Sequence, residues 1–153
     1  MSTAWSGLSN ASAYSKQAPL IHVQLIEMIE LELNKKITEK PYGLFLDIGC
    51  GTGVNTLRFV DHFQGAFNSV IGLDCNENYI RAAKKHSDQY KNVEFRVWTS
   101  TDELPVEPNT VDLIACICSV HYMDPVEKFL EKCQLALKPG GILGIFSKNE
   151  ANV

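Results

Sequence analysis

The chain has 153 residues, of which 45% are hydrophobic, and a formal net charge of -4, a composition typical of one soluble globular domain with a single core. Its 14 basic residues stand against 18 acidic ones without a Lys/Arg cluster longer than a pair, which disfavours nucleic-acid binding. No apolar stretch approaches the roughly 18 residues that a membrane span needs, and the polar beginning of the chain favours a cytoplasmic protein.

Residues 1–40 are expected to form an N-terminal segment ahead of the main domain, residues 41–153. Residues 1–18 carry no periodic pattern. The spacing of apolar residues then predicts an amphipathic helix over Pro19–Asn34. Its buried face is expected to comprise Ile21, Leu25, Met28 and Ile29.

From residue 41 onwards, continuous apolar runs alternate with helical faces, which is typical of a parallel sheet buried on both sides. Strands are expected at 44–48, 69–74, 93–98, 111–117 and 142–147. Right-handed crossovers between such strands give an α/β, Rossmann-like open twisted sheet of five parallel strands flanked by helices. Its ligand crevice would lie at the carboxyl ends of the strands.

The most clearly marked helix follows the fourth strand. Asp124 is expected at its N-cap and Pro125 at its first helical position. The helix should end at the Lys138–Gly141 segment. The predicted buried stripe consists of Val126, Phe129, Leu130, Cys133 and Leu137.

The five cysteines are expected to be free thiols, because four of them, Cys75, Cys116, Cys118 and Cys133, fall within apolar stretches. Cys116 and Cys118 are alternate residues of a strand. The two-residue spacing and the partner His/Cys pair of a zinc site are missing. The sequence therefore predicts no metal site.

The most informative segment is Leu44–Gly53, in which an apolar strand carrying Asp47 is followed by glycines at alternate positions. Glycine lets the chain turn sharply and brings its backbone close to a ligand. The N–H groups that open the following helix, from about Thr52, would then face an anionic ligand group. This segment predicts a small-molecule site at the end of the first strand.

The acids around this segment favour a nucleoside ligand over a dinucleotide. The dinucleotide fingerprint needs a third glycine where Val54 stands. Asp74 ends the second strand, where a carboxylate can accept hydrogen bonds from both hydroxyls of a ribose. A nicotinamide-dependent oxidoreductase remains the weaker alternative.

Four blocks in this order resemble the class I S-adenosylmethionine-dependent methyltransferases. Within that class, the His121–Asp124 segment is similar to the type 11, trans-aconitate methyltransferase-like branch. The Tyr14–Pro19 segment is also similar to that branch's N-terminal motif, with Ala18 in place of an arginine. The four blocks are Leu46–Gly53, Ile71–Asp74, Ser100–Pro105 and Leu137–Leu143.

The resemblance implies S-adenosylmethionine as the cofactor. The glycine loop would lie against its methionine part with Asp47 near the ammonium group, and Asp74 would bind the ribose. Cys75 and Asn76 would flank the adenine, and the segment from Ser100 would read the adenine edge. The implied cofactor-binding residues are Asp47, Gly49, Cys50, Gly51, Asp74, Cys75, Asn76, Ser100, Thr101 and Asp102.

The resemblance also implies a small-molecule methyl acceptor, with a carboxylate as the first candidate, bound by His121 and Tyr122. Methyl transfer from a sulfonium needs alignment more than a dedicated base. His121 would orient a carboxylate acceptor, or act as the catalytic base for a hydroxyl or amine. A purely structural, hydrogen-bonded histidine is the alternative reading of His121.

Members of this class continue past the fifth strand with another helix and two strands, whereas this chain ends six residues after Ser147. Residues 142–146 should therefore form a hydrophobic strand with an unpaired outer edge. We expect a truncated methyltransferase or self-association through that edge. The alternative is a non-catalytic form that keeps the fold and the cofactor site but acts as an interaction or regulatory module.

Overall fold

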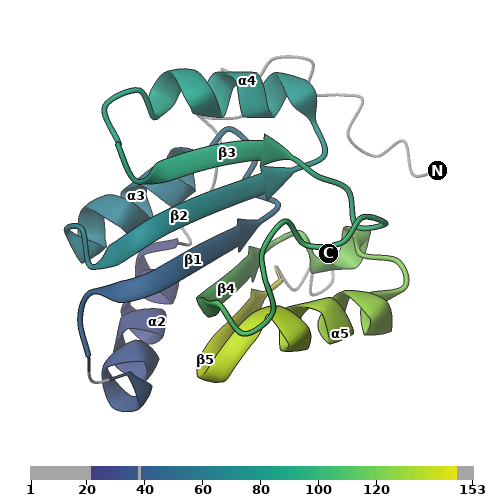
Figure 1. The fold of residues 1–153 in the computed structure, drawn as a ribbon. Helices are drawn as coiled ribbons and strands as arrows, with labels where there is room; N and C mark the ends of the chain where they lie inside the picture. Colours follow the sequence, from purple (N-terminus) through teal and green to yellow (C-terminus); the bar gives the residue numbers. More distant parts are fainter. Residues whose placement is uncertain (1–21, 38, 148–153) are drawn as a thin grey trace, which may run out of the picture.

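The computed structural model describes residues 22–37 and 39–147. Within them, the chain forms one parallel sheet with helices on both faces, in the strand order β3-β2-β1-β4-β5 (Figure 1). The strands are β1 (Tyr42–Ile48), β2 (Phe67–Asp74), β3 (Val93–Val97), β4 (Val111–Ile117) and β5 (Leu137–Phe146). The helices are α2 (His22–Lys36), α3 (Val54–Phe63), α4 (Glu77–His86), α5 (Val126–Ala136) and the short 3₁₀ helix η1 (Val120–Tyr122). The predicted fold class is confirmed.

The core has two main layers, one on each face of the sheet. On one face, α2 and α3 bury Leu33 and Phe59 against Phe45 of β1. On the other face, Phe129 of α5 packs with Leu46 of β1. Because central strands are covered on both sides, their sequences read as continuous apolar runs.

Helix α2 ends at Lys36, two residues beyond the predicted Asn34, and its buried face differs from the prediction. Leu25 and Ile29 are buried as expected. Met28 is 57% exposed, so its predicted burial was wrong. The core-facing line of the helix runs through Leu25, Ile29 and Leu33 at a spacing of four, which leaves Met28 on the flank. Ile21, which was predicted on the buried face of this helix, lies outside the described residues. The Tyr14–Pro19 segment also lies outside them.

The start of α5 also differs from its prediction. Pro125 is the N-cap, in an extended conformation with no side-chain capping bond, so the predicted capping role of Asp124 was wrong. Val126 and Leu130 are 36% and 38% exposed, against the predicted buried stripe. The buried line is instead Phe129, Cys133 and Ala136.

The chain passes from α5 into β5 without a turn. The predicted helix stop at Lys138–Gly141 is confirmed, because α5 ends at Ala136 with Leu137 as its C-cap. Leu137, which was expected in the buried stripe of the helix, instead belongs to β5 and pairs with Val111 of β4. The register then shifts before Ile142 pairs with Leu113. In the described sheet β5 has β4 as its one neighbour, so the expected unpaired outer edge is confirmed for this part of the chain.

A buried carboxylate joins three strands at the amino end of the sheet. Asp112 Oδ2 accepts hydrogen bonds from the backbone N–H groups of Gly43, at 2.8 Å, and Leu44, at 3.1 Å. It also accepts one from Lys138 Nζ at 2.9 Å. Asp112 therefore fixes the start of β1 relative to β4 and β5, at the opposite end of the strands from the crevice. None of the described helices is long and apolar enough to cross a membrane.

Candidate functional site

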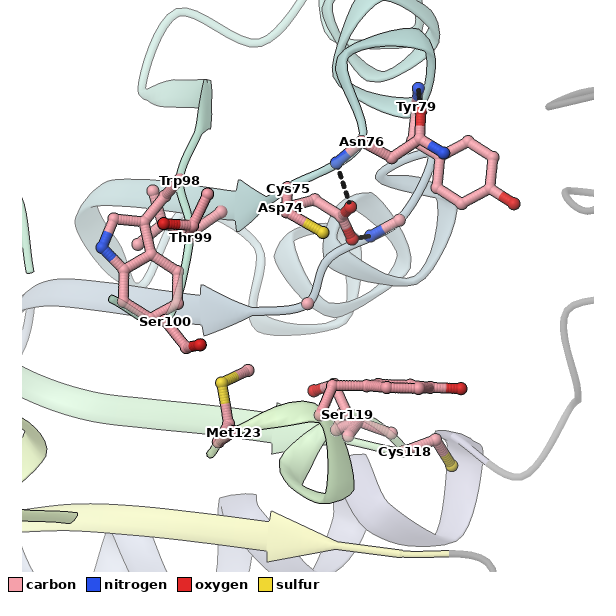
Figure 2. A pocket seen from close by; sticks show the side chains of 15 residues that line it. Asp74, Cys75, Asn76, Tyr79, Trp98, Thr99, Ser100, Cys118, Ser119 and Met123 are labelled. Carbon is pink, nitrogen blue, oxygen red and sulfur yellow. Dashed lines mark hydrogen bonds between the residues drawn. The ribbon is translucent and has the colours of Figure 1, made fainter. Parts of the chain in front are cut away.

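A cavity of about 470 Å³ opens at the carboxyl ends of β1, β2 and β4 (Figure 2). This volume lies within the usual range for small-molecule sites. Figure 2 shows residues 74–79 and 98–100 on one side, facing Cys118, Ser119 and Met123 on the other. The lining residues are Gly49, Gly51, Leu73, Asp74, Cys75, Asn76, Tyr79, Trp98, Thr99, Ser100, Ile117, Cys118, Ser119, Tyr122 and Met123.

Asp74 supplies the charge in this lining. Its Oδ2 accepts a hydrogen bond from the backbone N–H of Gly51 and its Oδ1 from that of Asn76, both at 2.9 Å (Figure 2). Burial raises the pKa of this carboxyl, and the two N–H donors oppose the rise. Because each carboxylate oxygen can accept a second hydrogen bond, Asp74 can still receive two hydroxyl donors from a ligand.

The glycine loop turns through left-handed backbone, with φ values of 76° at Gly49, 57° at Gly51 and 75° at Gly53. A Cβ at Gly49 would lie 2.4 Å from Ser119 Cβ, and one at Gly53 would lie 2.6 Å from Phe95 Cζ. Two of these glycines therefore make room for neighbouring protein atoms as well as permitting the turn. Gly49 and Gly51 both reach the cavity wall.

Two of the expected cofactor residues lie behind this loop and not in the cavity wall. Asp47 is 6% exposed and its Oδ2 accepts a hydrogen bond of 2.5 Å from Thr56 Oγ1. Burial raises the pKa of Asp47 to about 6, the Thr56 bond opposes the rise, and the charge of Asp74 adds to it. Cys50 is buried with Leu57 and Phe95, and burial raises the pKa of its thiol.

The connection after β3 forms the left wall of the cavity in Figure 2 with Trp98, Thr99 and Ser100. Trp98 is 5% exposed, and its indole Nε1 donates to the carbonyl oxygen of Glu103 at 3.0 Å. Thr101 and Asp102, also expected at the cofactor, are exposed and do not line the cavity.

The opposite wall follows β4. Ser119 is buried, and its Oγ donates to the carbonyl oxygen of Ile48 at 2.8 Å, which ties this wall to the end of β1. Tyr122 lines the cavity. His121 is exposed outside the lining, and its ring packs on that of Tyr122 with 3.9 Å between the centroids. The two expected acceptor residues are therefore neighbours, with Tyr122 nearer the cavity.

Several lining residues were not expected at the site from the sequence, namely Leu73, Tyr79, Thr99, Ile117, Cys118, Ser119 and Met123. A usable signal existed for most of them, because they lie within a few residues of a strand's carboxyl end. Cys75 was expected in an apolar stretch but is exposed, since it follows the last residue of β2. All five cysteines are free. The described residues contain no cluster of His, Cys, Asp or Glu suited to a metal ion.

Residues 45–141 match the family model described as "Methyltransferase domain". A ubiquinone biosynthesis O-methyltransferase from Bradyrhizobium sp. is 30% identical over 122 residues, which cover 78% of this chain and 46% of that protein. The protein of the same name from Nitrobacter winogradskyi is 31% identical over 105 residues, covering 68% of this chain and 38% of that protein. The chain thus spans less than half the length of these relatives.

Solved structures share the fold. A SAM-dependent methyltransferase from Aquifex aeolicus superposes with a TM-score of 0.71 at 22% identity, covering 94% of this chain and 77% of that one. The [4+2]-cyclase SpnF superposes with a TM-score of 0.65 at 24% identity, covering 78% of this chain and 43% of that one. A cyclase among these neighbours means that the fold alone does not fix the reaction.

Proposed function

This chain belongs to the methyltransferase domain family, and on that premise we propose that it binds S-adenosylmethionine in the cavity and transfers the methyl group to a small-molecule acceptor. Residues 41–153 would form the cofactor-binding domain. The observation that carries the proposal is the Asp74 carboxylate, which lies in the cavity wall beside the glycine loop with free acceptor capacity on both oxygens.

The residues present fit the cofactor. Asp74 would accept hydrogen bonds from the two ribose hydroxyls, since Gly51 and Asn76 use one acceptor position on each of its oxygens. Trp98 and Tyr79 give the cavity flat aromatic surface for a purine. Cys75, Asn76 and Ser100 line the same region.

Asp47 and Cys50 would support cofactor binding without contacting the cofactor directly. The Asp47 carboxyl is buried behind the loop and bonded to Thr56. In its ionised form it would attract the cationic end of the cofactor through the electrostatic field, because charges interact strongly across a poorly solvated interior. Cys50 would support the loop by packing. Thr101 and Asp102 would act by shaping the loop that carries Ser100.

The cofactor supplies an electrophilic methyl group bonded to a sulfonium, so the protein's task is to align the acceptor. We propose that Tyr122 and Met123 form the surface against which the acceptor lies. On transfer, the acceptor oxygen would gain the bond to the methyl carbon, and the electron pair of the broken C–S bond would remain on sulfur. A hydroxyl acceptor also loses its proton, for which His121 on Tyr122 is the candidate base.

We place a hydroxyl acceptor ahead of a carboxylate. The charged side chain among the described lining residues is the anionic Asp74, which would repel a carboxylate. The trans-aconitate methyltransferase-like resemblance of His121–Asp124 supports the carboxylate instead. The relatives named as O-methyltransferases support transfer to oxygen. If a hydroxyl is methylated, His121→Gln should lower kcat, whereas for a carboxylate it should raise KM and leave kcat largely unchanged.

The test of the cofactor site is a calorimetric titration of the chain with S-adenosylhomocysteine. We expect binding by the wild type, a loss of about tenfold or more in Asp74→Ala from two missing hydrogen bonds to a charged group, and wild-type affinity in Asp88→Ala. Asp88 is an exposed acid in the turn after α4 and serves as the matched control. Absence of heat with the wild type at millimolar ligand would refute the proposal.

A second candidate function rests on the edge of the sheet. The outer side of β5 carries no strand within the described residues, and Ile145 is 39% exposed. Met28 and Leu31 of α2, each 57% exposed, lie on a helix that packs against β5. Such an edge can pair with a second copy, so the chain would then be an interaction or regulatory module that keeps the cofactor site. Sedimentation of a monomer at micromolar concentration, together with measured methyl transfer, would refute this candidate.

A further inference from the structure

One lysine outside the cavity forms hydrogen bonds with the loop whose residues Trp98, Thr99 and Ser100 line one wall of the cavity. Lys132 lies on α5, and its Nζ donates to the carbonyl oxygen of Ser100 at 3.0 Å and to that of Asp102 at 2.7 Å. Two carbonyl groups thus converge on one ammonium group. Lys132 is partly buried and does not line the cavity.

The rest of the loop is bonded to itself and to the site. The backbone N–H of Trp98 donates to the carbonyl oxygen of Asp74 at 3.0 Å, so the loop begins beside the proposed ribose carboxylate. The N–H of Asp102 donates to Thr99 O, and the indole of Trp98 donates to Glu103 O, both at 3.0 Å. Together with the two hydrogen bonds from Lys132, these three hydrogen bonds hold the loop in one conformation. The same connection runs on along α5, where Asn109 N–H donates to Leu135 O (Figure 1).

The lysine also sets which way the peptide groups of this loop face. In a trans peptide the C=O and the following N–H point in opposite directions, and the cis bonds among the described residues lie elsewhere, before Pro41 and Pro125. Because the carbonyl of Ser100 accepts from Lys132 Nζ, the N–H of Thr101 points away from that ammonium group. Lys132 thereby also fixes the orientation of this N–H donor.

We propose that Lys132 is a positioning residue which holds the 98–103 loop against α5 and thereby sets how strongly and how selectively the cavity binds the purine of its ligand. The inference rests on the proposed function, and it names the purine because the wall concerned combines the Trp98 indole with the polar side chains of Thr99 and Ser100. A flat aromatic surface beside fixed hydrogen-bonding groups suits a nucleobase.

The test compares two ligands in four forms of the whole chain. S-adenosylhomocysteine and S-inosylhomocysteine, which differ at the purine edge, are titrated calorimetrically into the wild type, Lys132→Met, Lys132→Arg and Lys128→Met. Lys128 is an exposed lysine one turn earlier on α5 and is the matched control. Arginine retains a charged donor that can reach two carbonyl oxygens.

We expect Lys132→Met to bind S-adenosylhomocysteine about tenfold more weakly and to lose most of its preference over the inosyl ligand. Lys132→Arg should recover most of both, and Lys128→Met should match the wild type. An unchanged preference in Lys132→Met, whether affinity is retained or both ligands weaken equally, would overturn the inference. A wild type that binds neither ligand would refute the proposed function itself. Amide hydrogen exchange in the 98–103 loop tests the positioning role independently of ligand binding. Equal exchange rates in the wild type and in Lys132→Met would refute that role.

Discussion

The packing of Gly49 against Ser119 gives the most specific stability prediction. Gly49 has a φ of 76°, and a Cβ on it would lie 2.4 Å from Ser119 Cβ and 2.5 Å from Ser119 Oγ. Ser119 cannot move away freely because its Oγ is bonded to Ile48 O. Gly49→Ala should therefore incur two separate penalties, one from the backbone conformation and one from the overlap.

The two penalties on the free energy of unfolding can be separated, because Gly65 offers a control for the backbone penalty alone. Left-handed backbone costs a non-glycine residue about 1–2 kcal/mol, and forcing a methyl group into a packed site costs about 1–3 kcal/mol more. Gly65 has the same φ of 76°, but a Cβ there would meet nothing within 4 Å. We expect Gly65→Ala to lose about 1–2 kcal/mol and Gly49→Ala about 2–5 kcal/mol of the free energy of unfolding.

Urea unfolding followed by circular dichroism measures both losses. Adding Ser119→Gly to the Gly49→Ala variant should recover the overlap penalty, which a double-mutant cycle would report as a coupling of about 1–3 kcal/mol. Equal losses in Gly49→Ala and Gly65→Ala, or a coupling near zero, would contradict the reasoning.

Three further predictions concern charge and thiols. Burial raises the pKa of Asp47 from 3.8 to about 6, so the folded chain holds this proton more tightly than the unfolded chain. The resulting stabilisation is roughly 3 kcal/mol of the free energy of unfolding. It is complete below about pH 4 and is lost as the pH rises through 6. Urea unfolding at several pH values should show that Asp47→Asn removes this pH dependence. Asp112→Ala should destabilise the chain by about 3–5 kcal/mol by leaving a lysine and two N–H groups without their acceptor, while calorimetry should find S-adenosylhomocysteine affinity unchanged. Iodoacetamide should label exposed Cys75 well before buried Cys116 and Cys133, whose thiol pKa values burial raises to about 11 and 12; mass spectrometry showing equal rates would contradict this.

Local patterns predicted the parts of the fold that local chemistry determines. Strand β4 was predicted at 111–117 and is observed there, because an apolar run buried on both faces leaves a distinct signal. The position of Asp74 at the cavity followed in the same way, since it ends such a strand and precedes a helix.

Features that depend on distant residues could not be predicted. The sequence does not show that Gly49 leaves room for Ser119, or that Lys132 bonds to Ser100 and Asp102, because these pairs meet only in the folded chain. The capping prediction for Asp124 failed for a related reason, since Pro125 stays extended where α5 meets the preceding turn. Residue type alone suggested a cap that the backbone does not form.

The proposed cofactor site depends most on Asp74 accepting hydrogen bonds from the ribose of the cofactor. The direct measurement is the affinity of the wild type and of Asp74→Ala for S-adenosylhomocysteine and for its analogue lacking both ribose hydroxyls. We predict that removing the hydroxyls weakens binding to the wild type by about tenfold or more and has little effect on the variant. Equal sensitivity of the two proteins to the missing hydroxyls would contradict the account.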